Sequence, residues 1–434
     1  MINTFLNRLG IDQLKPMQEA AIKAIKPSTD TIILSPTGSG KTLAFLLPVL
    51  EMIDPGNPGV QALILTPSRE LALQIEQVFK QMQSGFKVNT CYGGHPMKTE
   101  RNNLKEPPAL LIGTPGRIAD HFRRGTIDPD PIDIFIMDEF DKSLELGFRN
   151  EMEFITQCLG KISTRVLTSA TNITEIPDFT GIVKPVTLDF AEHSESQKLA
   201  LCAVRAEGTD KLEALFRLIC HLGNEASLIF CNHRETVERI SGLLLAKEVM
   251  HGIYHGGLEQ EDRELALIRF RNGTHHLLLT TDLASRGLDI PEIKHVIHYQ
   301  FPTTETAWIH RNGRTARMHA SGTAWLVMAE EDYLPGFISE KPVFIKVPED
   351  CVLPGLPEWE TVYIGAGKKD KISKGDIAGF LMQKGMLAKD ELGKIEVLDY
   401  ASFAAVKRQK TDKVLRLVSN EQIKKKSVKI DVAR

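Results

Sequence analysis

The sequence predicts an α/β fold with two parallel-sheet domains in tandem, followed by a small α+β domain. Short apolar runs alternate with helical stretches, the alternation lapses once and restarts, and the last part of the chain follows a different order of elements. At 434 residues the chain also exceeds what one compact core usually supports.

Five short apolar runs in the first part of the chain resemble strands that are buried on both faces of a parallel sheet. They are residues 31–35, 62–66, 109–113, 134–138 and 165–169. Helical stretches such as residues 70–82 lie between them and supply βαβ crossovers. We therefore expect a first domain at residues 1–190.

The alternation lapses through the polar residues 191–197 and then restarts. The second set of apolar runs comprises residues 227–231, 276–280, 295–299 and 323–327. These runs predict a second parallel-sheet domain at residues 198–338. Four prolines between residues 341 and 358 indicate a connector, which we place at residues 339–360.

The final segment, residues 361–434, is expected to form a third domain. Its expected order is a strand, a helix, two strands, a helix and a strand, at residues 360–367, 374–384, 393–400, 402–408, 412–419 and 427–433. This βαββαβ order is typical of an RRM-like sandwich. The segment holds 17 Lys and Arg against 9 Asp and Glu, a net charge of +8, whereas the whole chain carries −3. Such a basic domain suits a polyanion partner, although a solvated lysine-rich surface would give the same charge.

Composition points to a cytoplasmic protein that is not a membrane protein. Hydrophobic residues make up 42% and charged residues 25% of the chain, and no apolar run is long enough to span a membrane. The N-terminus lacks the features of a secretion signal. The six cysteines are scattered without a C-x-x-C pair, which argues against a disulfide framework or a zinc site. We expect a monomer.

The segment from Ser35 to Thr42, Ser-Pro-Thr-Gly-Ser-Gly-Lys-Thr, follows an expected strand and opens an expected helix. Its glycines let successive backbone N–H groups approach and cradle phosphate oxygens. The lysine can reach the outer phosphates of ATP, and the hydroxyl after it can ligate Mg²⁺. The expected nucleotide contacts in this loop are Ser35, Thr37, Gly38, Ser39, Gly40, Lys41 and Thr42.

Two carboxylates follow the apolar run at residues 134–137. Asp138 comes at the carboxyl end of this strand, where ligands bind in open α/β sheets, and is the expected Mg²⁺ ligand together with Thr42. Glu139 is the expected group to orient and deprotonate the attacking water.

The tetrad Asp138-Glu-Phe-Asp141 resembles motif II of the DEAD-box RNA helicases, a family of superfamily 2, and the other family motifs follow in order. Motifs Ia, GG, Ib, III, IV, V and VI are resembled by residues 67–72, 93–94, 114–117, 169–171, 228–234, 280–289 and 310–317. The resemblance covers about residues 1–335. It departs from the family pattern at Phe140, Asn312 and Ala316, and the adenine-reading Q motif retains Gln18 without its upstream aromatic residue.

This resemblance implies two RecA-like domains and RNA-stimulated ATP hydrolysis. Gln18 and Asp282 would contact the nucleotide, and Asp282 would contact the ribose or link to motif VI. Arg314 and Arg317 would stabilise charge on the transferred phosphoryl group. The residues implied to couple ATP to RNA are Asp141, Ser169, Thr171 and His310. The implied RNA-backbone contacts are Arg69, Gly94, Thr114, Gly116, Arg117, Thr280 and Arg286.

Residues 362–376 resemble the RNA-binding domain of DbpA-like bacterial DEAD-box proteins. The aromatic pattern that stacks bases in ordinary RRMs is missing from the sequence, so basic residues are expected to hold a structured RNA. They are Lys368, Lys369, Lys371, Lys407, Arg408 and Lys410. The resemblance implies ribosomal RNA and large-subunit assembly, with the domain acting as a tether for the motor. Two alternatives stay open: an ATP-gated RNA clamp or annealer with little unwinding activity, and a DNA-directed translocase.

Overall fold

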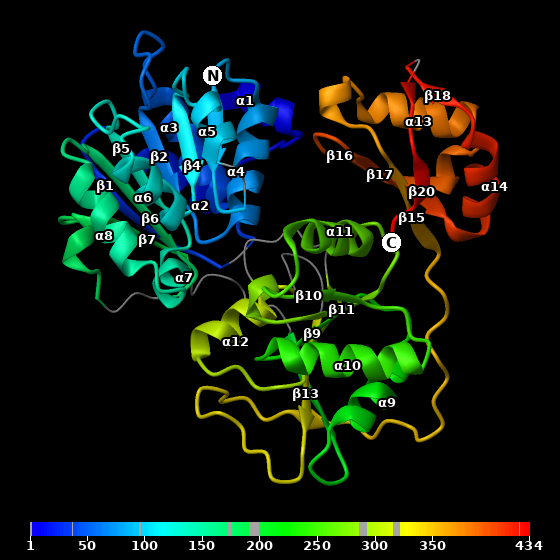
Figure 1. The fold of residues 1–434 in the computed structure, drawn as a ribbon. Helices are drawn as coiled ribbons and strands as arrows, with labels where there is room; N and C mark the ends of the chain where they lie inside the picture. Colours follow the sequence, from blue (N-terminus) through cyan, green and yellow to red (C-terminus); the bar gives the residue numbers. More distant parts are fainter. Residues whose placement is uncertain are drawn as a thin grey trace. The chain divides into compact units, whose positions relative to one another are not determined.

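The computed structural model describes residues 2–36, 38–94, 97–171, 175–190, 199–285, 293–315, 322–424 and 426–434. The chain forms two compact units. The first contains one sheet, and the second contains a sheet of similar plan and a smaller C-terminal sheet (Figure 1).

The first sheet is parallel throughout and has the order β3-β4-β2-β5-β6-β1-β7. Its strands are β1 (Asp30–Leu34), β2 (Ala62–Leu65), β3 (Val88–Cys91), β4 (Leu110–Gly113), β5 (Ile134–Met137), β6 (Thr164–Ser169) and β7 (Val186–Asp189). The five apolar runs expected from the sequence form β1, β2, β4, β5 and β6, while β3 and β7 were not predicted.

Helices cover both faces of this sheet. They are α1 (Ile2–Leu9), α2 (Pro16–Ala24), α3 (Lys41–Met52), α4 (Arg69–Met82), α5 (Met97–Asn103), α6 (Pro115–Arg123), α7 (Phe140–Glu145) and α8 (Arg149–Cys158), with the short 3-10 helix η1 (Asp178–Thr180). Alternate strand residues enter different cores: Ile33 packs with α1 to α4, whereas Ile32 packs with α6 and α8. Burial on both faces is why the strands are continuously apolar.

The second sheet has the order β10-β11-β9-β12-β13-β8-β14 and is also parallel. Its strands are β8 (Leu199–Arg205), β9 (Ser227–Phe230), β10 (Gly252–Tyr254), β11 (Leu277–Thr280), β12 (His295–His298), β13 (Gly322–Met328) and β14 (Val343–Phe344). Its helices are α9 (Leu212–Leu222), α10 (Arg234–Ala246), α11 (Gln260–Arg271), α12 (Glu305–Asn312) and η2 (Asp282–Ser285).

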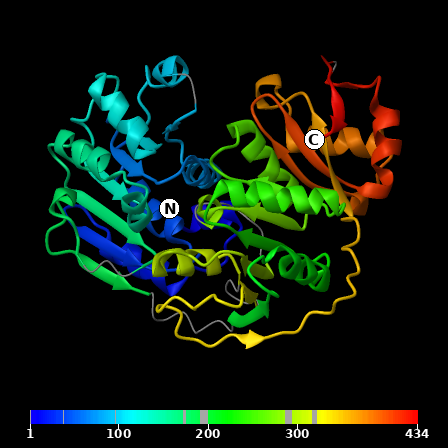
Figure 2. The ribbon, with the colours of Figure 1, turned by 60° about the horizontal axis from the view of Figure 1, so that its bottom comes forward.

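The expected connector is partly structured. Strand β14, which lies within residues 339–360, pairs with β8 and extends the second sheet. The connector, yellow to orange in Figures 1 and 2, then runs around the second sheet domain to the C-terminal domain.

The C-terminal domain has an antiparallel sheet of order β16-β17-β15-β20. Its main elements are β15 (Trp359–Ile364), η3 (Lys368–Asp370), α13 (Lys374–Gln383), η4 (Lys389–Glu391), β16 (Leu392–Val397), β17 (Ser402–Lys407), α14 (Arg408–Val418) and β20 (Ile430–Val432). A small hairpin of β18 (Gln422–Ile423) and β19 (Lys426–Ser427) precedes the last strand. The βαββαβ order predicted from the sequence is present.

One face of the C-terminal sheet packs against α11, as Figures 1 and 2 both show. Ile268 of α11 is fully buried against Phe403 and Ala433. Around this apolar centre, Thr361 Oγ1 lies 2.7 Å from Thr274 Oγ1, and Arg271 pairs with Glu396 at 3.0 Å. The sheet domain and the C-terminal domain of the second unit are therefore joined by a mixed apolar and polar interface, which a loose tether would not form.

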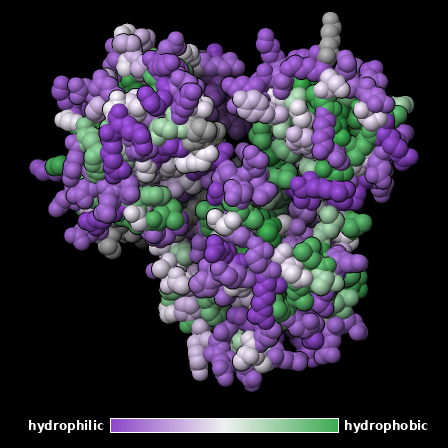
Figure 3. Space-filling model, in the orientation of Figure 1, coloured by the Kyte–Doolittle hydropathy of each residue, from purple (hydrophilic) through white to green (hydrophobic). Residues whose placement is uncertain are grey.

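Hydrophilic side chains cover most of the molecular face drawn in Figure 3. Among the described residues, no helix is both long and apolar enough to cross a membrane.

Candidate functional site

The loop between β1 and α3 has the backbone that a phosphate-binding loop requires. Gly38 and Gly40 have φ values of 79° and 97°, a left-handed region that disfavours other residues. A Cβ atom at Gly40 would also lie 2.5 Å from Gln18 Nε2. Thr42 lies in the first turn of α3, and Thr37 falls outside the described residues.

Lys41 folds back over this loop. Its Nζ donates to the carbonyl oxygens of Ser35 at 2.5 Å and Pro36 at 2.9 Å, and the side chain is buried. Ser39 Oγ is shielded from solvent and has no hydrogen-bond partner in the described part of the chain. A buried cation and an unsatisfied hydroxyl at the N-terminal end of a helix fit a phosphate group.

Gln18 ties the start of α2 to the same loop. Its Nε2 donates to Gly40 O at 3.2 Å, and its Oε1 accepts from Lys15 N at 3.0 Å. Lys15 Nζ in turn donates to Ser39 O at 3.0 Å, and burial lowers the pKa of this lysine. Gln18 thus lies against the phosphate loop, where the sequence places a nucleotide contact.

Asp138 follows β5 and is almost fully buried. Thr168, at the equivalent position of β6, donates its hydroxyl to Asp138 Oδ1 at 2.5 Å. Burial raises the pKa of Asp138, while the Thr168 hydrogen bond and the nearby Lys41 cation oppose this rise. A buried carboxylate held in one orientation beside Lys41 suits a divalent cation bound to phosphates.

Glu139 begins α7 with a left-handed backbone, φ 46°. Its N–H donates to the same Thr168 hydroxyl at 3.2 Å. Left-handed geometry costs free energy for a residue with a Cβ and is concentrated at functional sites. Thr168 therefore contacts both acidic residues, and it was not among the residues predicted from the sequence.

Phe140 and Asp141 complete the acidic tetrad. Phe140 is fully buried, with its ring centroid 6.2 Å from that of Phe179, so this departure from the family pattern is a core-packing residue. Asp141 Oδ2 accepts from Thr171 Oγ1 at 2.9 Å, and Ser169 Oγ donates to Thr171 O at 2.6 Å. The expected coupling residues of the first sheet domain are in contact.

Three candidate RNA-contact segments meet at one edge of the first sheet because they follow β2, β3 and β4, which are parallel neighbours. Arg69 opens α4 with its guanidinium 4.7 Å from the Tyr92 ring centroid. Arg117 Nε donates to Tyr92 O at 3.1 Å. Gly94 has φ 91°, and Thr114 and Gly116 lie at the start of α6.

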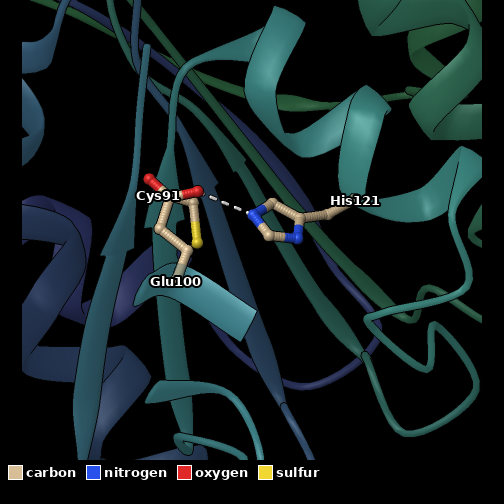
Figure 4. Close-up of side chains that lie close together, drawn as sticks. All are labelled: Cys91, Glu100 and His121. Atoms are coloured by element: carbon tan, nitrogen blue, oxygen red, sulfur yellow. Dashed lines mark hydrogen bonds and ion pairs between the residues drawn. The ribbon is translucent and has the colours of Figure 1, made fainter. Parts of the chain in front are cut away.

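A buried cluster lies behind this edge (Figure 4). The donor atoms of Cys91, Glu100 and His121 lie within 4.8 Å of one another. However, His121 Nε2 faces Glu100 Oε2 at 2.8 Å, and its Nδ1 lies 2.7 Å from Thr126 Oγ1. Burial raises the pKa of the Cys91 thiol, and the Arg117 cation, 3.4 Å from Glu100, opposes a metal ion. The cluster is a hydrogen-bonded network.

In the second sheet domain, Asp282 links to motif VI. Both its oxygens accept from Arg311, from Nε at 2.6 Å and from an Nη at 3.0 Å. Arg311 is fully buried and also donates to Gln300 O and Asn232 Oδ1, each at 2.8 Å. Arg311 was not among the residues predicted from the sequence, although it lies within motif VI.

The other candidates of this domain are mostly buried. His310 and Arg314 are 1% and 3% exposed. Thr280 is fully buried, and its hydroxyl donates to Tyr254 O at 2.8 Å. Contrary to the expectation of an RNA contact, this side chain is therefore not exposed in the structure. Arg286 and Arg317 lie outside the described residues.

The six basic candidates of the C-terminal domain separate into two sets. Lys368, Lys369 and Lys371 are exposed at the η3 turn. The other three pair with acidic residues of the chain: Lys407 with Glu358, Arg408 with Glu360 and Lys410 with Glu391. These partly exposed ion pairs give the three residues a structural contact, and their expected RNA contact stays a prediction.

Comparison with known families agrees with this geometry. Residues 15–179 match the DEAD/DEAH box helicase family, residues 210–319 the helicase conserved C-terminal domain, and residues 361–432 the DbpA RNA binding domain.

Individual relatives share nearly the whole chain. The ATP-dependent RNA helicase DbpA of Escherichia coli (strain K12) is 31% identical over 98% of this chain and 96% of that protein. The protein of the same name from Bacillus subtilis (strain 168) is 29% identical over 99% and 96%.

Solved structures resemble the helicase part. S. cerevisiae Dbp5 bound to RNA and ADP BeF3 gives a TM-score of 0.67 at 27% identity, covering 75% of this chain and 86% of that one. Mss116p bound to ssRNA and AMP-PNP gives 0.66 at 26%, covering 76% and 72%. Together with the phosphate loop, the acidic tetrad and the C-terminal sheet, these matches show that the chain belongs to the DEAD-box family of ATP-dependent RNA helicases and ends in a DbpA-type RNA-binding domain.

Proposed function

We propose that this helicase remodels structured ribosomal RNA during assembly of the large ribosomal subunit, acting as a cytoplasmic monomer. The observation that carries the proposal is the exposed lysine turn of the DbpA-type domain, at Lys368, Lys369 and Lys371. Ribosomal RNA is the substrate that the resemblance to DbpA-like proteins implies.

The first domain binds the phosphates of ATP through the glycine loop and Lys41. Thr42 and Asp138 would hold Mg²⁺, which would supply positive charge beside the phosphate oxygens. Glu139, with its backbone fixed by Thr168, orients the attacking water and accepts its proton. Arg314 and Arg317 supply positive charge to the transferred group.

The first domain grips RNA through the edge that follows β2, β3 and β4. Its contacts are Arg69, Gly94, Thr114, Gly116 and Arg117, a set of cations, backbone and helix-start groups. Such groups bind phosphate and sugar and do not read sequence. Asp141 and Thr171, which share a hydrogen bond, couple this grip to the nucleotide.

Recognition of the particular RNA belongs to the C-terminal domain. Its open sheet face is where ordinary RRMs stack bases, but here this face is covered by α11, and Phe403 is only 7% exposed. The lysine turn follows β15, and its three lysine side chains are exposed. RNA is therefore recognised through phosphates and shape at the turn.

The test compares ATP turnover with ribosomal RNA, generic RNA and duplex DNA. In the full chain, changing Lys368, Lys369 and Lys371 to Gln should raise the KM for ribosomal RNA about tenfold. It should also reduce the slope of log affinity for ribosomal RNA against log salt concentration by about two. The KM for generic RNA should stay unchanged. The matched control changes the exposed Lys105, Lys161 and Lys184, which precede β4, β6 and β7, to Gln.

Equal effects of the two triple variants would contradict recognition at the turn. Turnover without strand separation of a short RNA duplex would favour the ATP-gated clamp. Stimulation by duplex DNA equal to that by RNA would favour the translocase.

A further inference from the structure

Glu100 is a buried carboxylate in the first domain that no motif of the sequence analysis contains. It lies on α5, and 5% of its surface is exposed. Burying an unpaired carboxylate costs several kcal/mol, so the surroundings of a buried glutamate indicate what it is held for.

Each oxygen of Glu100 reaches a segment that carries a candidate RNA contact. Oε1 accepts from the backbone N–H of Tyr92 at 3.2 Å. Oε2 lies 3.4 Å from Arg117 Nε, the same atom that donates to Tyr92 O at 3.1 Å. Glu100 thereby closes a ring between the residue before the Gly93-Gly94 pair and the arginine of α6.

Tyr92 also contacts Arg69, which lies on the third segment with a candidate RNA contact. Its ring lies under the Arg69 guanidinium, 4.7 Å from the centroid. A Cβ atom added at Gly94 would lie 3.9 Å from an Nη of Arg69, so the glycine pair approaches the same cation. Fixing the Tyr92 backbone thus fixes the surface on which Arg69 rests.

His121 and Thr126 hold the carboxylate from behind. His121 is fully buried, and its Nε2 lies 2.8 Å from Glu100 Oε2 (Figure 4). Its Nδ1 lies 2.7 Å from Thr126 Oγ1. Thr126 Oγ1 also lies 3.0 Å from His121 O, which fixes the hydroxyl to the end of α6. The hydrogen bonds from Thr126 through His121 to Glu100 therefore hold the carboxylate in one orientation.

We propose that Glu100 is a positioning residue of the RNA grip, which sets the places of Arg117 directly and of Arg69 through Tyr92. Preorganised cations bind phosphate more tightly than mobile ones, because less side-chain entropy is lost on binding. This inference rests on the proposed roles of Arg69 and Arg117 in RNA binding.

Glu100→Gln tests the proposal in the full chain. The amide keeps an oxygen for Tyr92 N–H but removes the negative partner of Arg117. We expect the KM for RNA in RNA-stimulated ATP turnover to rise about threefold to tenfold, with kcat and the KM for ATP within about twofold. A purely structural role would lower the melting temperature and leave the KM for RNA unchanged, and that result would overturn the proposal.

A double-mutant cycle with Arg117→Gln supplies the second readout. If Glu100 acts through Arg117, the double variant binds RNA no more weakly than Arg117→Gln alone. Additive losses would mean that Glu100 acts elsewhere, against the proposal. Should Glu100→Gln fail to fold, Thr126→Val, which loosens His121 only, replaces it and should shift the KM for RNA in the same direction.

The cycle also separates this inference from the function on which it rests. An unchanged KM for RNA in Arg117→Gln would refute the proposed RNA contact itself. If the KM for RNA rises in Arg117→Gln but stays at the wild-type value in Glu100→Gln, only the positioning role is refuted.

Discussion

Thr168 donates its hydroxyl to Asp138 across 2.5 Å and so joins the ends of two neighbouring parallel strands. The same oxygen accepts from the N–H of Glu139. One uncharged side chain therefore contacts the Asp138 carboxylate and the Glu139 backbone, which makes it a sensitive position for testing the proposed hydrolytic site.

Thr168→Val retains the side-chain shape and removes this hydroxyl. Hydrogen bonds to charged groups contribute about 1.5–3 kcal/mol, so we expect kcat for ATP hydrolysis to fall about tenfold or more. Steady-state ATP turnover at saturating RNA measures the change. An unaltered kcat would show that Asp138 and Glu139 keep their places without Thr168.

The matched control is Thr31→Val in β1 of the same sheet. Thr31 is fully buried, and its hydroxyl has no hydrogen-bond partner among the described residues. Removing an unsatisfied buried hydroxyl is neutral or stabilising. We expect wild-type ATP turnover and an equal or higher melting temperature.

Thr171→Val separates hydrolysis from RNA remodelling. The variant loses the hydrogen bond to Asp141 Oδ2 while Lys41, Asp138 and Glu139 stay in place. We expect ATP turnover within about twofold of wild type and about fivefold fewer duplexes separated per ATP hydrolysed. Parallel assays of phosphate release and duplex separation give this ratio, and an equal loss in both would contradict a coupling role.

His298 makes the second unit sensitive to acid. Burial and the neighbouring Arg311 cation lower the pKa of His298 to about 3, against an ordinary value of 6.5. Below pH 6.5, therefore, the His298 imidazole is protonated in the unfolded chain but stays neutral in the folded chain until the pH approaches 3. The stabilisation is complete above pH 6.5 and is lost as the pH falls toward 3, by up to about 1.4 kcal/mol per pH unit.

His298→Gln should reduce the slope of unfolding free energy against pH by up to one proton between pH 6 and pH 4. Denaturant unfolding followed by tryptophan fluorescence measures it, because Trp308, Trp325 and Trp359 all belong to the second unit. The exposed His233→Gln controls for loss of an imidazole. A slope identical to wild type would show that His298 is protonated in the folded protein.

Ile268→Glu should release the C-terminal sheet from α11, since it places a charge at the fully buried centre of the interface. Amide hydrogen exchange should accelerate at least about tenfold in α11 and β15. Leu245→Glu, at a 68% exposed position of α10, is the control. Unchanged protection in Ile268→Glu would show that the polar contacts Thr361–Thr274 and Arg271–Glu396 suffice to hold the C-terminal sheet on α11.

The central strands were predictable because burial on both faces makes them continuously apolar. The missed strands lie at or near sheet edges: β3 and β7 border the first sheet, and β10 and β14 the second. Strand β7 has only half-buried or exposed residues and so carries no apolar signal. Strand β8, beside two-residue β14, was also missed, although residues 199–204 are all apolar.

The candidate site was predictable where one short segment carries its chemistry, as in the glycine loop. Thr168, Arg311 and Glu100 contact Asp138, Asp282 and His121, which lie 30, 29 and 21 residues away in the sequence, so strand register and burial are needed to find them. Conversely, Arg408 shows its charge in the sequence, but its partner Glu360 lies on another element.

Phe403, Thr361 and Ile268 join the C-terminal sheet to α11, so the two domains of the second unit move as one body. RNA bound at the η3 turn, as proposed above, would then be fixed in orientation relative to the second sheet. Its orientational entropy would be lost once, on binding, and a rotation of the sheet domain would rotate the RNA with it.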